Sequence, residues 1–503
     1  MTAVEGLLYG LGVALAPANL LACFVGVLVG TVVGVLPGIG PIGAMALLLP
    51  STFALDPTAA LIMFAGIYYG AMYGGSTTSI LVNVPGEAAS VVTCLEGYQM
   101  ARRGRAGAAL AVSAVGSFVA GTLGVVGLVF VGRWLADAAL HFGPPEYFAL
   151  TVAGLAVLSR LSGTSLPRAA LMVGLGLALG TVGMEPMSGV SRFTFGSLQL
   201  SQGIELVPVA MGLFGIAEIL TLAEQRGRLP RVSSVRLREL LPSGEEWRRS
   251  LAPMLRGSAL GFVVGLVPGP AAVLSTFLSY AVERRLARRP QEFGHGAIEG
   301  VAGPEAANNG ATAGALVPLL ALGVPFAPAT ALLLAALVIH GVQPGPLLAS
   351  QRPDLFFGVA ASLYVGNVIL LVLNLPLIGL FVSLLRLPQS LLVSLIVLLA
   401  MVGTYSVNNS VLDLWVLVVM GVLGWALRRR GFEPALIVLA LVLGPMMEKT
   451  LRQTLFMARG DPSVVLGRPL TLALLAAGLL AVLLPALRRA RGWTPAQAPA
   501  GEP

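Results

Sequence analysis

Long apolar stretches recur along the whole of this chain, and they constrain its fold more than any other feature. Many of them approach the roughly 20 residues that a helix needs to cross the hydrocarbon core of a bilayer. Charged residues make up 11% of the sequence and hydrophobic residues 56%, whereas a soluble domain carries about 25% charged residues. A β-barrel would show short alternating segments instead of continuous apolar runs. The sequence therefore predicts an all-α polytopic membrane protein.

The positive charges of the chain gather in short segments between the apolar stretches. The net charge of +8 comes almost entirely from arginine, since Lys449 is the single lysine. Cytoplasmic loops of membrane proteins are enriched in Lys and Arg, so these clusters indicate loops that stay inside, and they give no indication of nucleic-acid binding. Placing every cluster inside predicts about 10–12 transmembrane helices. The clusters are Arg102 to Arg105, Arg226 to Arg256, Arg284 to Arg289, Arg428 to Arg430 and Arg488 to Arg491.

Two apolar regions are interrupted in the same way, which indicates an internal repeat. The segment 33–38, Val-Gly-Val-Leu-Pro-Gly, matches 264–269, Val-Gly-Leu-Val-Pro-Gly. Each is followed by a second interrupted element, with a break at 85–86 in the first copy and at 325–326 in the second. Proline removes a backbone donor and glycine adopts conformations that other residues avoid, so the chain can turn at these points. Two ordered pairs of matching breaks predict two repeats, each with a re-entrant hairpin and a broken helix.

The two repeats are expected to have opposite orientations in the membrane. With the arginine clusters inside, the base of the second hairpin lies inside and the base of the first lies outside. Inverted repeats with broken helices are typical of secondary transporters, whose sites lie near the bilayer midplane. The expected organisation is a first repeat core over 1–105 (hairpin tip 37–41), scaffold helices over 106–223, a cytoplasmic basic linker over 224–256, a second repeat core over 257–346 (hairpin tip 268–270), scaffold helices over 347–491 and a disordered tail over 492–503.

The substrate site is predicted at the hairpin tips, the two breaks and a run of small polar residues. Helix ends at a break offer unpaired N–H groups and a partial positive charge, which attract a carboxylate. The alternatives are a simple turn at each break and packing of helices through small residues. The predicted substrate-binding residues are Pro37, Gly38, Gly74, Gly75, Ser76, Thr77, Thr78, Asn83, Pro85, Gly86, Pro268, Gly269, Gly323, Pro325 and Phe326.

The segment from Pro304 to Thr312 contains one carboxylate and two amides directly before a long apolar run. Burying such groups without partners costs several kcal/mol, and ionisable residues at membrane depth mark ion or substrate pathways. We therefore predict ion coupling at Glu305, Asn308 and Asn309, either through Na⁺ held by Glu305 and Asn308 or through a proton on Glu305. A helix cap at the cytoplasmic edge is the alternative. No other cofactor is expected.

Other classes of protein fit the sequence less well. A membrane-embedded enzyme would need a nucleophile and base or a metal-binding motif such as H-E-x-x-H, and the sequence has no such motif and no P-loop. A channel or sensor would explain neither the paired breaks nor their inversion. We therefore expect no enzymatic activity.

Several longer motifs resemble the large membrane subunit of tripartite tricarboxylate transporters. They are the segments 35–41, 73–80, 83–87, 293–309, 318–325 and 340–346. The resemblance implies a multi-pass protein of the bacterial inner membrane that imports an organic carboxylate by an ion gradient. It also implies two partners, a small membrane subunit and a periplasmic solute-binding protein, and it allows a homodimer. The alternative is a stand-alone ion-coupled carrier or antiporter. Pro325-Phe326 departs from the Pro-Gly that the family tends to have, which extends the candidate tricarboxylate and dicarboxylate substrates to aromatic carboxylates.

Overall fold

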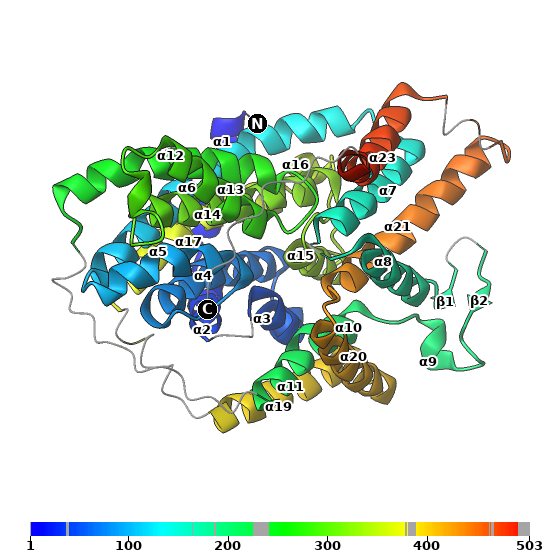
Figure 1. Cartoon of the computed structure of the whole chain (residues 1–503). Helices are drawn as coiled ribbons and strands as arrows, with labels where there is room; N and C mark the ends of the chain where they lie inside the picture. The colour runs from blue at the N-terminus through cyan, green and yellow to red at the C-terminus, as the bar shows by residue number, and fades with distance from the viewer. Residues whose placement is uncertain are drawn as a thin grey trace.

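The computed structural model describes residues 2–36, 40–162, 164–185, 188–224, 241–377, 380, 389–461, 463 and 467–490. These residues form an almost entirely helical protein, as predicted, with one short antiparallel pair of strands, β1 (Gly183–Met184) and β2 (Ser191–Arg192) (Figure 1). The helices of the first half are α1 (Ala3–Ala14), α2 (Pro17–Val35), α3 (Gly40–Leu48), η1 (Leu49–Ala54), α4 (Pro57–Val82), η2 (Ala88–Ser90), α5 (Val91–Arg102), α6 (Ala106–Ala139), α7 (Pro144–Leu161), α8 (Leu166–Gly180), α9 (Leu198–Ser201), α10 (Leu206–Ala210), η3 (Met211–Ile216) and α11 (Ala217–Glu224). Those of the second half are α12 (Gly244–Gly265), α13 (Ala271–Leu286), η5 (Pro290–Glu292), α14 (Glu299–Leu322), α15 (Pro328–Ile339), α16 (Leu348–Gln351), α17 (Pro353–Asn374), α19 (Gln389–Asn408), α20 (Val411–Arg429), α21 (Ala435–Met457) and α23 (Pro469–Ala490).

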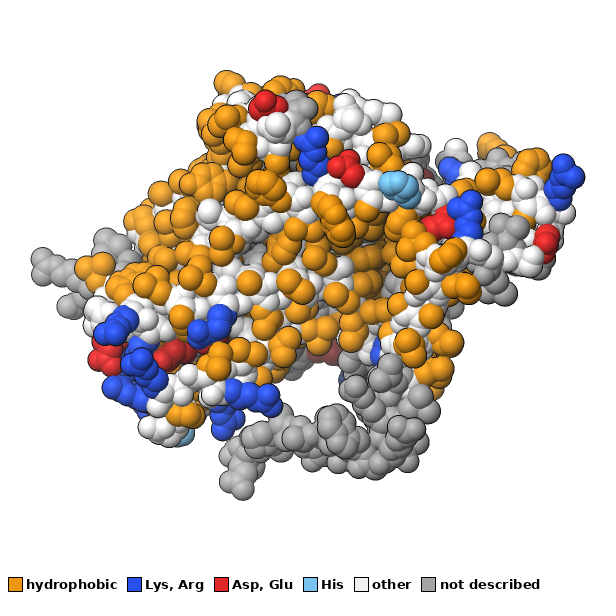
Figure 2. Space-filling model, turned by 90° about the horizontal axis from the view of Figure 1, so that it is seen from above, with side chains coloured by type: hydrophobic (Ala, Val, Ile, Leu, Met, Phe, Trp, Pro, Cys, Tyr) orange, Lys and Arg blue, Asp and Glu red, His pale blue; other side chains and the backbone are white. Residues whose placement is uncertain are grey.

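The surface of the protein suits a bilayer. Four helices in the described part of the chain, α2, α6, α17 and α20, are both long and apolar enough to span a membrane, and several shorter apolar helices accompany them. Hydrophobic side chains cover most of the face shown in Figure 2; basic side chains gather most densely at its lower left, and others lie at the right-hand edge. A broad apolar band with charge at its end is what lipid and its headgroups require. These features confirm the membrane class that the composition predicts.

Helices α2 and α4 pack in parallel, and the contact depends on glycine. A Cβ atom added at Gly26 would lie 2.2 Å from the carbonyl oxygen of Met63, and one at Gly30 would lie 2.4 Å from that of Ile67. Residue numbers rise in the same direction along both helices of this contact, so the two helices are parallel. Small residues spaced four apart let helix backbones approach closely inside a membrane.

Helices α12 and α14 repeat this arrangement in the second half. A Cβ atom at Gly257 would lie 2.2 Å from the carbonyl oxygen of Gly303, and one at Gly261 would lie 2.1 Å from that of Ala307. This pair is also parallel, so the same glycine spacing produces the same close contact twice.

Both predicted breaks end a long helix in the left-handed conformation. Helix α4 ends at Asn83 with φ 57°, and α14 ends at Gly323 with φ 72°. This C-cap conformation favours glycine and asparagine, and the proline two residues later cannot continue a helix. The sequence signals at both breaks are therefore explained by helix termination.

The central helices α4 and α14 are almost completely buried. They run antiparallel, since Ser76 bonds to Glu305 while Tyr68, earlier in α4, interacts with Thr312, later in α14. Helices α5 and α6 lie against this pair, and α12 and α13 also pack against α14. The candidate site therefore lies where the two halves meet. The predicted tip residues Pro37 and Gly38, residues 225–240 of the predicted linker and the predicted tail lie outside the described residues, whereas the end of the predicted linker belongs to α12.

Candidate functional site

The carboxylate of Glu305 is the centre of a polar cluster inside the protein. Glu305 is 1% exposed, and its oxygens accept hydrogen bonds from the hydroxyl groups of Ser76 at 2.5 Å, Ser113 at 3.0 Å and Thr93. These donors lie on α4, α6 and α5, so four helices from both halves meet at one carboxyl group. A buried carboxylate requires such partners because water cannot reach it.

The two predicted amides extend the cluster along α14. The Nδ2 atom of Asn308 donates to the carboxylate of Glu87 at 3.0 Å, and that of Asn309 donates to the hydroxyl of Ser117 at 2.7 Å and to the carbonyl oxygen of Glu305 at 3.2 Å. The Oδ1 atoms of both amides are buried without a hydrogen-bond partner among the described residues. Native structures rarely leave such acceptors unpaired, and an ion or water is a common explanation.

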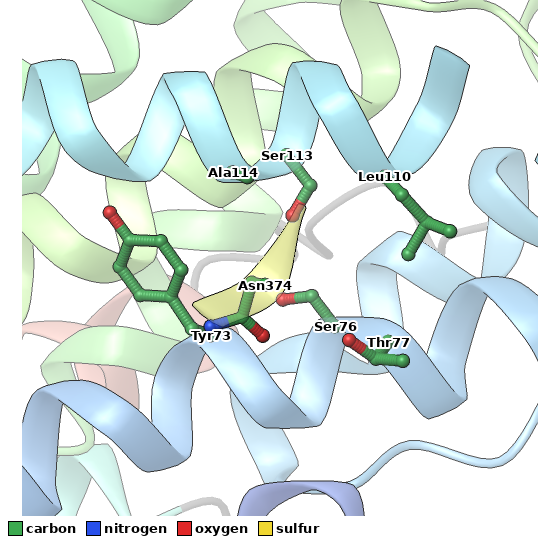
Figure 3. Close-up of a pocket in the computed structure, with 7 residues that line it drawn as sticks. All are labelled: Tyr73, Ser76, Thr77, Leu110, Ser113, Ala114 and Asn374. Atoms are coloured by element: carbon green, nitrogen blue, oxygen red, sulfur yellow. The ribbon is translucent and has the colours of Figure 1, made fainter. Parts of the chain in front are cut away.

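A small cavity lies beside the hydroxyl partners of Glu305. Its volume is about 10 Å³, which corresponds to space for about one water molecule. The hydroxyl groups of Ser76 and Ser113 point towards it from opposite helices, and the side chain of Asn374 reaches it from the end of α17 (Figure 3). The lining residues are Tyr73, Ser76, Thr77, Leu110, Ser113, Ala114 and Asn374.

The predicted glycines of the first half act mainly through close packing. A Cβ atom at Gly74 would lie 2.3 Å from the carbonyl oxygen of Thr31, so Gly74 belongs to the α2–α4 contact. Gly75 lies against the side chain of Glu87, and Gly86 packs against the backbone of Gly34 and Gly75. The chain after the first break therefore packs back against α4 beside Gly75, next to the polar cluster. Thr78 donates to the carbonyl oxygen of Gly75 at 3.1 Å, whereas Asn83 and Pro85 are exposed at the turn.

The predicted residues of the second half form a separate group. The N–H of Gly269 donates to the carbonyl oxygen of Phe326 at 3.1 Å, so the turn between α12 and α13, which includes Pro268, contacts the second break. Gly323, Pro325 and Phe326 are buried, and Phe326 is part of the hydrophobic core. No hydrogen bond joins this group to Glu305 among the residues that the structure describes.

Sequence reasoning missed several residues of the cluster. Thr93, Ser113 and Asn374 lie in helices where no recognisable motif marks them; the fold alone brings Thr93 and Ser113 to Glu305 and Asn374 to the adjacent cavity. Glu96 was also missed. It is fully buried and accepts hydrogen bonds from the N–H groups of Gly294, Gly296 and Ala297 and from the hydroxyl of Tyr280. The glycines at 294 and 296, both with positive φ, were the signal for a loop that wraps an anion.

The cluster can hold a proton or a small cation. Its ligands are oxygen atoms, which hard cations prefer. In the described part of the chain, no three His, Cys, Asp or Glu side chains are grouped closely enough to hold a metal ion, so a cation at Glu305 would depend on hydroxyl and amide oxygens. An oxygen-lined carboxylate inside an apolar helical protein is a feature of membrane transport proteins.

Comparison with known proteins agrees with this class. The sequence profile of the Tripartite tricarboxylate transporter TctA family matches residues 20–439. A protein of Agrobacterium vitis, named "Uncharacterized 52.8 kDa protein in TAR-I ttuC' 3'region", is 48% identical over 495 residues, which cover 98% of this chain and 98% of that protein. Another from that organism, "Uncharacterized protein in TAR-II ttuC' 3'region", is 46% identical over 234 residues, covering 46% of this chain and 97% of that protein. No solved structure matches significantly.

The chain therefore belongs to the TctA family, the large membrane subunit of tripartite tricarboxylate transporters. It is a multi-pass membrane component of a bacterial transport system and not an enzyme. The resemblance found in the motifs is confirmed over most of the chain.

Proposed function

We propose that this chain is the permease subunit through which organic carboxylates enter the cell across the inner membrane, driven by an ion gradient. A periplasmic binding protein delivers the carboxylate, and a small membrane subunit completes the complex. Family membership supports the tripartite organisation. The observation that carries the coupling role is the burial of Glu305 among three hydroxyl donors from three helices.

Glu305 lies where a change in its charge acts on both halves of the protein. Its hydroxyl partners belong to α4, α5 and α6 of the first half, whereas Glu305 itself belongs to α14 of the second. A proton removes the charge of the carboxyl group and a bound Na⁺ compensates it, so either ion changes the strength of all three hydrogen bonds. The interface between the halves would then respond to the coupling ion, which is what a coupled carrier requires.

Inverted repeats are the architecture in which this coupling would operate. Two parallel helix pairs joined by glycine, α2 with α4 and α12 with α14, support the repeat. The left-handed ends of α4 and α14, the packing of Gly86 against Gly34 and the hydrogen bond from Gly269 to Phe326 support it further. Since α4 and α14 run antiparallel, two pairs of this kind would cross the membrane in opposite directions. The carboxylate would bind at the breaks, whose helix ends supply N–H donors.

The coupling role is tested with Glu305→Gln in proteoliposomes that contain both membrane subunits. We expect net uptake driven by the gradient to fall by about tenfold or more, equivalent to about 1.4 kcal/mol, because glutamine keeps the size but cannot change its charge. Exchange of labelled for unlabelled carboxylate at equal ion concentrations should persist. Glu224→Gln is the matched control, because Glu224 forms an exposed ion pair with Arg429. Gradient-driven uptake equal to that of the unsubstituted protein would contradict the proposal.

A further inference from the structure

A second and much larger cavity lies away from Glu305. Its volume is about 380 Å³, and it is lined by Phe53, Glu205, Ile339, His340 and Asn408. Phe53 lies in η1 and Glu205 directly precedes α10. Ile339 and His340 lie at the end of α15, and Asn408 is the last residue of α19. We refer to this cavity as the acidic pocket. It is far too large for the single ion or water that the cavity near Ser113 can hold.

The acidic pocket is rich in hydrogen-bond acceptors. Glu205 contributes a carboxylate, and the charge of Asp413 interacts with it. Asn408 donates its Nδ2 to Asp413 at 3.0 Å, which leaves its Oδ1 as an acceptor. The Nε2 atom of His340 is buried without a partner among the described residues, and burial lowers the pKa of this imidazole. An uncharged imidazole has one acceptor nitrogen.

The charge of the pocket is the opposite of that of the chain as a whole. The protein carries a net charge of +8, yet no Lys or Arg is among the described residues that line this cavity. Glu205, Asp413 and the nearby Asp56, whose charge acts on His340, are all acidic. An anionic carboxylate substrate would be repelled here. A cationic guest is the one that these groups favour.

The pocket opens at the end of the protein opposite to the arginine-rich loops. Helix α14 begins at Glu299, which pairs with Arg249 at 2.7 Å at the arginine-rich end, and leads away from it. Pro344, four residues after His340, contacts Gly323 near the far end of α14. Helix α4 runs antiparallel to α14, so its start, next to Phe53 and Asp56, also lies at the far end. Because arginine-rich loops remain in the cytoplasm, the pocket faces the outside.

We propose that the acidic pocket receives an arginine side chain of the soluble binding protein and so forms part of its docking surface. This inference rests on the proposed function, since it requires that the binding protein delivers the substrate. A guanidinium group offers five planar donors, which suits the carboxylate of Glu205 and the Oδ1 of Asn408. Phe53, which is 37% exposed, offers an aromatic face on which a guanidinium can stack.

The direct test measures binding of the purified binding protein to the two membrane subunits in nanodiscs. For Glu205→Gln and, separately, for Phe53→Leu we expect the dissociation constant to rise roughly five- to tenfold. Guanidinium chloride at millimolar concentration should weaken binding to the unsubstituted protein more than sodium chloride at equal ionic strength. Asp461→Asn is the matched control, since Asp461 is exposed and its hydrogen bonds to Ser463 are local. Equal dissociation constants for Glu205→Gln and the unsubstituted protein, with both variants normally inserted, would overturn the inference.

Two further results separate the occupants of the pocket. Among arginine-to-alanine variants of the binding protein, one should weaken binding by an amount that is not additive with Glu205→Gln, because the two residues would touch. If Glu205→Gln instead altered the ion dependence of uptake and left the binding-protein dependence unchanged, the pocket would be an ion entrance and the inference would be wrong. If the unsubstituted protein transported without any binding protein, the proposed function itself would fail.

Discussion

Glu305 is the residue whose environment could be read least completely from the sequence. The unusual Glu-Ala-Ala-Asn-Asn run before an apolar stretch predicted a functional carboxylate with amides, and the structure places that carboxylate among buried polar groups. The three hydroxyl donors could not be predicted, because they lie 192 to 229 positions away in sequence. Serine and threonine are common in membrane helices, where they bond to their own backbone. Nothing local distinguishes Ser113 from such residues.

The hydroxyl of Ser113 should tune the affinity of the coupling ion. Ser113→Ala removes one of the three hydroxyl donors to Glu305, and with it a polar group that lines the small cavity. Loss of a hydrogen bond to a buried charged group costs about 1.5–3 kcal/mol. We therefore expect the half-saturating concentration of the coupling ion to change by at least about tenfold. The measurement is initial uptake as a function of Na⁺ concentration and, separately, of pH.

The matched control for Ser113→Ala is Ser406→Ala, because the Ser406 hydroxyl is exposed and bonds to the carbonyl oxygen of Val402 in its own helix. Unchanged dependence on both Na⁺ and pH in Ser113→Ala would show that this hydroxyl does not contribute to ion binding. A change in ion dependence of equal size in Ser406→Ala would mean that the effect is not specific to the cluster.

At the scale of elements, the sequence predicted both breaks, and the structure explains them by left-handed helix ends at Asn83 and Gly323. The glycines spaced four apart at 26, 30 and 34 and at 257, 261 and 265 were not among the predicted features. Their role in pairing α2 with α4 and α12 with α14 became clear from the close backbone contacts. Sequence spacing shows that a helix has a smooth face, but it does not show which helix packs on it.

The glycine contact of α12 with α14 should not tolerate a side chain. In Gly261→Ala, the new Cβ atom would lie 2.1 Å from the carbonyl oxygen of Ala307, so the helices must separate along their whole contact. We expect a clearly lower thermal stability in detergent and strongly reduced uptake. Gly174→Ala is the matched control, since no atom lies within 4 Å of its Cβ position. There we expect no loss, and up to about 1 kcal/mol of added helix stability. Equal behaviour of the two variants would contradict the close packing.

Glu96 should hold the loop that precedes α14. Three backbone N–H groups and the hydroxyl of Tyr280 donate to its carboxylate, so Glu96→Gln replaces charged acceptors with a single neutral one. The cost is about 1.5–3 kcal/mol for hydrogen bonds to a charged group. We expect trypsin to cleave faster after Arg288 in inside-out vesicles, whereas the bond after Arg289 is resistant because Pro290 follows it. Glu245→Gln is the control, because Glu245 is exposed and pairs with Arg289 at 3.3 Å. Cleavage at the unsubstituted rate in Glu96→Gln would mean that the loop is held by other contacts.

At the scale of the whole molecule, composition and the arginine pattern were sufficient to predict the membrane class. The orientation of the two halves follows from the same pattern and can be tested by labelling. In a chain with Cys23→Ala and Cys94→Ala, we expect Ser350→Cys to react with an impermeant maleimide added outside intact cells. Arg103→Cys should react with the same maleimide only after the membrane is permeabilised. The same accessibility for both positions from outside would contradict the inverted arrangement. Ser350 and Arg103 are both exposed, so burial does not bias the comparison.

The sequence predicted one group of substrate-binding residues, whereas the structure separates them into the Glu305 cluster and the contact of Gly269 with Phe326. The difference arises because the break of each half packs within that half: Gly86 lies against Gly34 and Gly75, and Phe326 bonds to Gly269. In a transporter that moves one part of the protein against another, the Glu305 cluster and the Gly269–Phe326 contact would act at different stages of the transport cycle. The distance between the two breaks could not be predicted from the chain, since it depends on how α4 and α14 are staggered.

The most direct test of the central claim is uptake of labelled organic carboxylates by proteoliposomes that contain this chain and its small membrane subunit. Uptake is measured with and without the loaded binding protein, and with and without an inward ion gradient. We predict accumulation when both are present, and its loss when either is removed. Accumulation that needs neither the binding protein nor the gradient would contradict a binding-protein-dependent, ion-coupled permease.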